Sequence, residues 1–368
     1  MDEIRTFEES HIQDVANLEA KIFHGRGKAG SALCEYVAEI FLRNPWRDHE
    51  MPSLVYMHGG KIVGFAGVIP RRMVFRGEDV RVAAVSQLMV DAAEYRGMAG
   101  FEMVRKIFSG PQDLTLTDGA TEPACAVWTA AGARVAQLYS LQWLRVLRPL
   151  SHYRRVVAEH PRTVPASRAL LNAAAPAASA ADALLRKLPA RALRTEDGGL
   201  VCEPADAAAI LAYIRKIGWS EELAPCYDDD SFRWLLNEAA AARAHGAFRM
   251  CTLREANGSP AGWLIYYVRA GGESTVLQMG SSPRRFDSVI QAALHDAYEQ
   301  GAASISGPLI PRALLNLANQ QCGFRYIGNG VLAHSRNTDI LNCILRGDAA
   351  LSRLDAEWWA RFAVGDWE

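Results

Sequence analysis

The sequence lacks any arrangement of cysteine or histidine that is typical of a metal site. Its seven cysteines and nine histidines are scattered, and none lies at the paired spacing of zinc ligands. An odd number of cysteines also argues against a framework of disulfide bonds. We therefore expect no metal, and thiols that stay reduced as they do in the cytoplasm.

The chain has neither an excess of one charge nor a long hydrophobic run. Forty Lys and Arg residues stand against 41 Asp and Glu residues, which gives no overall signature of nucleic-acid binding. No apolar run reaches the roughly 20 residues of a membrane span, and no signal-peptide pattern is present. These absences predict a soluble, cytoplasmic protein. Its 368 residues suit two domains rather than one.

The most informative feature is an apolar, strand-like run that breaks at a basic, glycine-containing turn. The run ends in Leu88-Met89-Val90, and Phe101–Phe108 follows with the apolar spacing of one helix face. Between them, Arg96 supplies a positive charge, while Gly97 and Gly100 let a ligand approach the backbone. A helix N-terminus favours an anion, so the pattern predicts a pyrophosphate site. The alternative is a plain strand–turn–helix connection with an exposed arginine.

This turn resembles the acyl-CoA pyrophosphate loop of the GNAT acyltransferase superfamily. Members usually carry Arg or Gln, two residues, Gly, one residue, and then Gly or Ala. Here Arg96 is followed by Ala99 and Phe101 at the two glycine positions. The resemblance implies an acyl-CoA co-substrate, acetyl-CoA above others. It implies contacts to that co-substrate from Leu88, Met89, Val90, Arg96, Gly97, Met98, Ala99, Gly100 and Phe101.

The predicted elements of the first 150 residues follow the order βααβββαβαββ, which is that of a GNAT domain. We expect strands at 3–7, 54–57, 61–68, 80–90 and 114–117, helices at 10–23, 31–42, 101–108 and 123–131, and closing strands within 135–147. The fold class is therefore α/β, with a mostly antiparallel central sheet flanked by helices.

The order of anchors in this region recurs later in the chain. Gln87 and Gly132 are 45 positions apart, as are Gln278 and Gly323. We predict a second GNAT-like domain at 196–345; chance similarity between two α/β segments is the alternative. The second copy lacks the anion loop, because no glycine stands beside its two arginines at 284–285.

Residues 151–195 form a basic linker rich in Ala and Pro between the two domains. Its arginines and lysine are Arg154, Arg155, Arg162, Arg168, Arg186, Lys187, Arg191 and Arg194. One interpretation is a surface for an anionic partner such as membrane lipid, RNA or an acidic acceptor. The other is a plain linker with a few helical turns.

The tail at 346–368 combines charges and aromatic residues at close spacing. It is similar to an ending of tandem GNAT-like proteins that we associate with bacterial surface-polysaccharide and secondary-metabolite loci. Asp355, Glu357 and Arg361 could reach the acceptor. Alternatively, Trp358-Trp359 anchors the tail on a core while the charges pair with one another.

The family resemblance also implies catalytic roles. Members usually take the base from a Glu or Asp on neighbouring strands and the acid from a Tyr on the helix after the fifth strand. Trp128 stands at that Tyr position and is not a practical acid, so Tyr139 is the substitute. Asp118 is the first candidate base, because it follows strand 114–117 at its carboxyl end. The other acidic candidates are Asp91, Glu94 and Glu122. A mechanism without a protein base, driven by orientation, is the alternative.

Together these features predict an acyltransferase that moves an acyl group from coenzyme A to an amine of a small metabolite, amino acid or amino sugar. Attack would be direct, within a ternary complex. Two alternatives stay open at this point. One is a Fem-type transferase that uses aminoacyl-tRNA, and the other is a GNAT-derived binding protein without catalysis.

Overall fold

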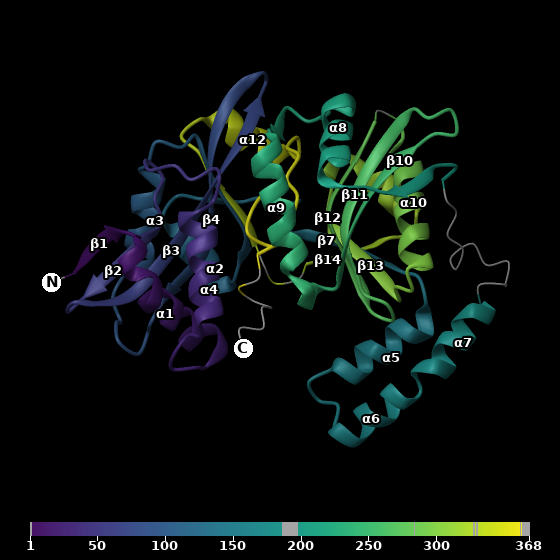
Figure 1. Ribbon diagram of the computed structural model, residues 1–368, viewed down its shortest axis with the longest axis horizontal. Helices are drawn as coiled ribbons and strands as arrows, with labels where there is room; N and C mark the ends of the chain where they lie inside the picture. The colour runs from purple at the N-terminus through teal and green to yellow at the C-terminus, as the bar shows by residue number, and fades with distance from the viewer. Residues whose placement is uncertain are drawn as a thin grey trace. The chain divides into compact units, whose positions relative to one another are not determined.

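The protein is described here by a computed structural model (Figure 1). It describes residues 2–185, 198–282, 284–326, 328, 330–360 and 362. The chain divides into two compact units, each built from separate stretches of sequence. Unit 1 comprises residues 1–140, 221–244 and 326–368, and unit 2 comprises residues 141–220 and 245–325. Among the described residues, no helix has the length and apolarity needed to cross a membrane.

Unit 1 contains a mixed sheet with the strand order β1-β2-β3-β4-β5-β15-β6, and β9 pairs with β3 beside this path. The strands are β1 (Glu3–Thr6), β2 (Leu54–His58), β3 (Lys61–Phe75), β4 (Glu78–Val90), β5 (Leu114–Ala120), β6 (Arg134–Val135), β9 (Leu223–Pro225) and β15 (Gly330–His334). The helices are η1 (Glu9–His11), α1 (Ile12–His24), α2 (Ser31–Leu42), α3 (Ala99–Phe108), α4 (Glu122–Ala130), α9 (Asp229–Ala241) and α12 (Thr338–Arg346).

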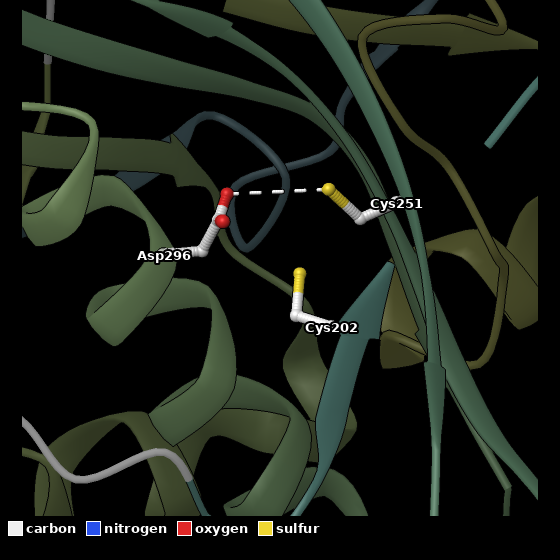
Figure 2. A group of neighbouring side chains, drawn as sticks. All are labelled: Cys202, Cys251 and Asp296. Carbon is white, nitrogen blue, oxygen red and sulfur yellow. Dashed lines mark hydrogen bonds between the residues drawn. The ribbon is translucent and has the colours of Figure 1, made fainter. Parts of the chain in front are cut away.

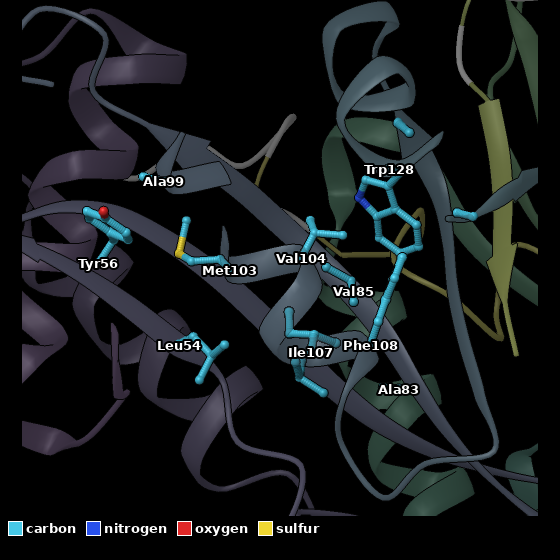
Figure 3. Close-up of a cluster of buried hydrophobic side chains, with 14 of the residues drawn as sticks. Leu54, Tyr56, Ala83, Val85, Ala99, Met103, Val104, Ile107, Phe108 and Trp128 are labelled. Carbon is cyan, nitrogen blue, oxygen red and sulfur yellow. The ribbon is translucent and has the colours of Figure 1, made fainter. Parts of the chain in front are cut away.

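Helix α3 forms where the apolar spacing predicts it, and it begins at Ala99, two residues earlier than expected. Its buried face packs on the sheet, as Figure 3 shows for Met103, Val104 and Ile107. The side chain of Trp128 in α4 is 1% exposed and packs in this core. Its ring lies edge-on to the ring of Phe108, with 5.3 Å between the ring centroids. Trp128 therefore has a packing role.

Unit 2 contains a second sheet, ordered β14-β7-β13-β12-β11-β10-β8. Its strands are β7 (Leu141–Val146), β8 (Val201–Pro204), β10 (Ala247–Arg254), β11 (Pro260–Val268), β12 (Glu273–Ser281), β13 (Ser304–Pro308) and β14 (Gly323–Tyr326). Its helices are α5 (Pro149–Glu159), α6 (Pro165–Ala173), α7 (Ala175–Leu185), α8 (Ala207–Ile217), α10 (Phe286–Glu299), η4 (Pro311–Ala313) and α11 (Leu314–Asn319), and η3 (Arg243–His245) joins stretches of the two units. The predicted fold class, two mixed sheets flanked by helices, is confirmed.

The compact units differ from the predicted domain ranges 1–150, 151–195, 196–345 and 346–368. Strand β7 was expected to close the first sheet, but it pairs antiparallel with β13 in the second. Strand β15 takes the place beside β5 in the first sheet. Residues 221–244 also join unit 1. The alternation of apolar residues marks a strand but not its partner, so the local pattern could not reveal this exchange.

The predicted linker is largely helical. Helices α5, α6 and α7 occupy most of residues 149–185, and all three belong to unit 2. The predicted basic residues Arg186, Lys187, Arg191 and Arg194 lie outside the described residues, as does Arg361 of the tail.

Candidate active site

The parallel pairing of β4 with β5 in unit 1 is short. It covers only Val82–Ala84 opposite Leu114–Leu116, although both strands continue beyond it. The backbone of Gln87 in β4 is left-handed, with φ of 54°, and the β3–β4 register shifts nearby. A bulge at this point bends β4 and interrupts the ladder. The two strands therefore part, and backbone groups beyond Ala84 and Leu116 are left without this pairing.

The carboxylate of Glu357, from the tail, lies at this opening between β4 and β5. Its Oε1 accepts a hydrogen bond of 2.6 Å from the Thr117 hydroxyl. Burial raises the pKa of Glu357, while hydrogen bonds from Thr117, Ser86 and the amides of Gln87 and Gly119 oppose that rise. A Cβ at Gly119 would lie 2.8 Å from Oε1. Glycine is therefore needed here for the carboxylate to approach the β5 backbone.

Asp118, the first candidate base, lies beside Glu357. Its Oδ1 accepts hydrogen bonds from the amides of Glu357 at 3.0 Å and Trp358 at 3.1 Å. Its Oδ2 is buried and has no hydrogen-bond partner among the described residues. Burial raises the pKa of Asp118 to about 8, and the charge of Glu357 adds to the rise. The group therefore exchanges a proton near neutral pH, as a general base must.

A buried guanidinium lies near the same carboxyl group. Arg71 of β3 is 4% exposed, and none of its three guanidinium nitrogens has a hydrogen-bond partner among the described residues. It sits 4.7 Å from the ring centre of Trp46 and 5.4 Å from that of Trp359. Burial lowers its pKa to about 10, and the charges of Asp355 and Asp118 oppose that change.

Asp355 anchors the tail below Arg71. Its side chain accepts hydrogen bonds from the Tyr227 hydroxyl and from the Ser352 amide and hydroxyl. Burial raises its pKa against these hydrogen bonds. Unit 1 thus contains three carboxyl groups of raised pKa, two of which, Asp118 and Glu357, lie at the opening between β4 and β5.

The predicted anion loop leads directly into α3. Helix α3 has no side-chain cap at its N-terminus. Arg96 is exposed and forms no ion pair within the described part of the chain. A Cβ at Gly97 would lie 2.2 Å from the Tyr95 hydroxyl, which shares a 2.9 Å hydrogen bond with Tyr56. The arrangement places a cation beside the start of a helix that has no side-chain cap, and the N-terminus of a helix is a favourable place for a phosphate.

The remaining predicted donor contacts lie along β4 and the start of α3. Leu88 and Val90 are half-buried against the α3 core, whereas Met89 is buried. Ala99 is fully buried, while Met98 is 58% exposed. Gly100 and Phe101 follow in the first turn of α3 and are half-buried.

The other acidic candidates do not gather around Asp118. Asp91 pairs with Lys21. Burial acts to raise the pKa of Asp91, but the ion pair and a hydrogen bond from the Ala93 amide lower it below its ordinary value. Glu94 is exposed, 3.9 Å from Lys61. Glu122 is an exposed residue of the first turn of α4.

Tyr139 is not placed as an acid. Its hydroxyl donates to the carbonyl of Ala349 at 2.7 Å and accepts from the amide of the same residue at 2.9 Å. Burial raises the pKa of this hydroxyl further above its ordinary value. The geometry makes Tyr139 an anchor for the chain at Ala349, so the predicted role as proton donor has no support here.

Unit 2 contains one compact group of potential metal ligands, drawn in Figure 2. Cys202, Cys251 and Asp296 place their ligand atoms within 4.8 Å of one another. Asp296, however, accepts two hydrogen bonds of 2.8 Å from Arg249 and another from Tyr266. A hydrogen bond with Cys251 and burial raise the pKa of Cys202. An ion-paired carboxylate and a thiol held neutral suit a structural cluster better than a cation site.

A cavity of about 300 Å³ lies at the other end of α3 from the anion loop. Met51, Lys106 and Gln112 are among its lining residues. Asp118, Glu357 and Arg96 are not, so this cavity is separate from the chemistry described above.

Sequence reasoning missed two parts of this site. Arg71 carried a signal, since it is a basic residue inside a long apolar strand. Tyr227 carried none, because residues 221–244 resemble any other part of the second half of the chain.

Residues 3–109 match the family model described as "Acetyltransferase (GNAT) domain". The match therefore concerns a GNAT domain at residues 3–109. No curated protein matches the chain in sequence. Similar solved structures include a conserved protein of unknown function, called a probable N-acyltransferase, from Enterococcus faecalis V583. It is 11% identical over 91% of this chain and 73% of that chain, with a TM-score of 0.58.

Two further solved structures share the fold of this chain. A GCN5-related N-acetyltransferase from Anabaena variabilis is 13% identical over 92% of this chain and 74% of that chain, with a TM-score of 0.58. Saccharomyces cerevisiae N-myristoyltransferase with bound myristoyl-CoA is 13% identical over 90% of this chain and 77% of that chain, with a TM-score of 0.51. At these identities the likeness concerns the fold alone.

Proposed function

We propose that the protein transfers an acyl group from coenzyme A to a primary amine at the β4–β5 opening of unit 1. The observation that carries this proposal is the Asp118 carboxyl group, with a pKa of about 8 and an unpartnered, buried Oδ2. The family match of residues 3–109 supports the same reaction. The acceptor is a small molecule with an amine, such as an amino acid, an amino sugar or another metabolite, and acetyl-CoA is the first donor to test.

Donor binding begins at the start of α3. Its free amides and the exposed Arg96 would hold the pyrophosphate through charge-assisted hydrogen bonds. The acyl end would then extend along β4, past Val90 and toward the bulge at Gln87. Backbone N–H groups of the bulge are the available donors for negative charge that develops on the thioester oxygen.

The chemical step needs a proton acceptor. Asp118 in its ionised form would take a proton from the ammonium group of the acceptor, which frees the nitrogen lone pair. The nitrogen attacks the thioester carbon, a C–N bond forms and the C–S bond breaks. The protonated Asp118 would return its proton to the thiolate of coenzyme A, and the second proton of the nitrogen leaves to solvent, which yields the neutral amide.

A non-catalytic binding protein is the second candidate. Glu357 already engages Thr117 and the Gln87 amide, which are groups that an acyl donor would approach. If the tail stays there, the opening is closed to the thioester. Binding and turnover measurements distinguish the two candidates.

The test is a calorimetric titration of the protein with acetyl-CoA and with octanoyl-CoA, beside Arg96→Glu and a control variant, Arg134→Glu. Arg134 is exposed in β6. We expect saturable binding that Arg96→Glu weakens about tenfold or more, since a hydrogen bond to a charged group contributes about 1.5–3 kcal/mol. The control should bind as the parent does.

Release of free coenzyme A is then followed with a panel of amines. Binding without turnover on any amine would favour the non-catalytic candidate. Absence of binding to either donor would overturn the proposal and move attention to a donor such as aminoacyl-tRNA.

A further inference from the structure

Helices α5, α6 and α7 form an arm, residues 149–185, that is held together by polar contacts rather than by a core. Asp182 of α7 is buried and accepts hydrogen bonds of 2.9 Å from the amides of Leu150 and Ser151 at the start of α5. Arg154 of α5 donates to the Leu171 carbonyl of α6 at 3.1 Å. The three helices lie together in Figure 1. These contacts fix the arm without covering its apolar side chains.

The arm exposes an unusual share of large apolar side chains. It makes up about a tenth of the chain but carries seven of the sixteen exposed large hydrophobic residues among those described. They are Leu150 (43% exposed), Tyr153 (62%), Val156 (49%), Val157 (52%), Val164 (59%), Leu170 (73%) and Leu184 (64%). Helix α6 buries no residue at all. Helices this short gain their stability from tertiary packing, so an arm of this kind is incomplete without a partner.

Three of the exposed residues share one face of α5, and the other two helices begin or end beside it. Leu150, Tyr153 and Val157 follow one another at helical spacing on α5. The Thr163 hydroxyl donates to the Val157 carbonyl at 2.5 Å, which brings the start of α6 beside the end of this stripe. Asp182 accepts a hydrogen bond from the first turn of α5, which places the end of α7 beside the beginning of α5. The exposed apolar residues of three helices that contact one another therefore lie in one region of unit 2, and a concentration of this kind indicates an interaction site.

The described residues of the arm carry more positive than negative charges. Among the described residues of the arm, the cations are Arg154, Arg155, Arg162 and Arg168 and the anions are Glu159 and Asp182. Asp182 is buried, and Glu159 pairs with Arg155 at 2.8 Å. An anionic surface would therefore meet an excess of arginine.

We propose that the arm binds the surface of a membrane that contains anionic lipid. Its helices have 11, 9 and 11 residues, too short to span a bilayer, but they combine apolar and basic side chains as interfacial helices do. RNA would pair with the arginines but leave Leu and Val side chains in water, and the patch has one aromatic residue for stacking. Lipid satisfies both the charge and the apolar area. This inference does not rest on the proposed acyl transfer.

The test is sedimentation of the full chain with vesicles of phosphatidylcholine alone and of phosphatidylcholine mixed with phosphatidylglycerol. The variants are Tyr153→Asp/Leu170→Asp and Arg162→Glu. The control is Leu315→Asp, since Leu315 is 75% exposed on α11, away from the arm sequence. The four side chains that these variants replace are all exposed. Circular dichroism with thermal unfolding verifies that each variant folds.

We expect binding to the mixed vesicles, weakened by added salt as surface electrostatics are, and little binding to phosphatidylcholine alone. The double variant should lose at least tenfold in affinity and Arg162→Glu about threefold, while Leu315→Asp binds as the parent does. Absence of vesicle binding would overturn the proposal. So would binding that the arm variants leave unchanged, a dimer that only the arm variants dissociate, or binding of RNA but not of vesicles.

Discussion

The two units share a sheet order. They differ in whether the arginine at the start of the corresponding helix forms an ion pair. At the start of α3 in unit 1, Arg96 is exposed and has no ion-pair partner within the described chain. At the start of α10 in unit 2, Arg285 pairs with Glu255 at 2.8 Å. A satisfied cation cannot hold a phosphate without losing its partner. The comparison therefore favours unit 1 as the place of the proposed donor binding.

The buried carboxyl groups differ in the same way. Asp118 in unit 1 has an unpartnered oxygen and a raised pKa. Asp296 in unit 2 is bonded to Arg249 and Tyr266. Burial acts to raise the pKa of Asp296, but these hydrogen bonds lower it below its ordinary value. An unsatisfied buried carboxyl oxygen costs stability, so Asp118 is the candidate for chemistry, whereas the bonded Asp296 has a structural role.

The largest expected effect is on turnover. Asp118→Asn removes the proton acceptor while keeping the side-chain shape, so we expect kcat to fall by about 10²- to 10⁴-fold with little change in donor affinity. Glu122→Gln, an exposed neighbour on α4, is the control and should keep its rate. Steady-state kinetics check this once an accepted amine is known. An Asp118→Asn protein with parental kcat would remove Asp118 from the mechanism.

The second prediction applies one substitution type to both units. Arg249→Met leaves Asp296 buried without its ion-pair partner, which should lower the free energy of unfolding by about 3–5 kcal/mol. Arg71→Met replaces a guanidinium that forms no hydrogen bonds among the described residues, so we expect a change below about 1 kcal/mol. Chemical denaturation measures both. Equal losses in the free energy of unfolding would contradict the expected difference between the two arginines.

The third prediction concerns pH. Since Asp118 must be ionised to act, the rate should rise tenfold per pH unit below its pKa of about 8 and level off above it. The raised pKa means that the folded state binds this proton more tightly than the unfolded state. Its contribution to stability is therefore complete below about pH 4 and is lost as the pH rises through about 8.

Glu357→Gln sharpens this prediction, because the charge of Glu357 contributes to the raised pKa. The midpoint of the rate profile should move to lower pH in this variant. A midpoint that stays in place, or moves upward, would contradict the coupling between the two carboxyl groups.

The smallest effect is expected from the glycines of the anion loop. Gly97→Ala would bring a Cβ within 2.2 Å of the Tyr95 hydroxyl and displace it from Tyr56, so we expect a few-fold loss of donor affinity. At Gly100 the nearest atom to a Cβ is 3.7 Å away, on Val90, and Gly100→Ala should bind as the parent does. Calorimetry compares the two. Equal affinities would mean that the Tyr95–Tyr56 contact does not shape the loop.

The sequence by itself determined the elements and the place of the anion loop. Helix α2 spans 31–42 as its apolar spacing predicts, and α3 follows the basic turn, because a helix period and a glycine-containing break are local properties. The second sheet was also foreseeable from the repeated anchors at equal spacing.

Only the tertiary structure decided which sheet β7 and β15 join and what surrounds Asp118. The alternation within a strand assigns its faces but leaves its partner open. The pKa of Asp118 depends on burial and on Glu357, whose amide is bonded to it from 239 residues further along the chain. Desolvation and neighbouring charge are properties of the packed chain, so no local pattern contains them.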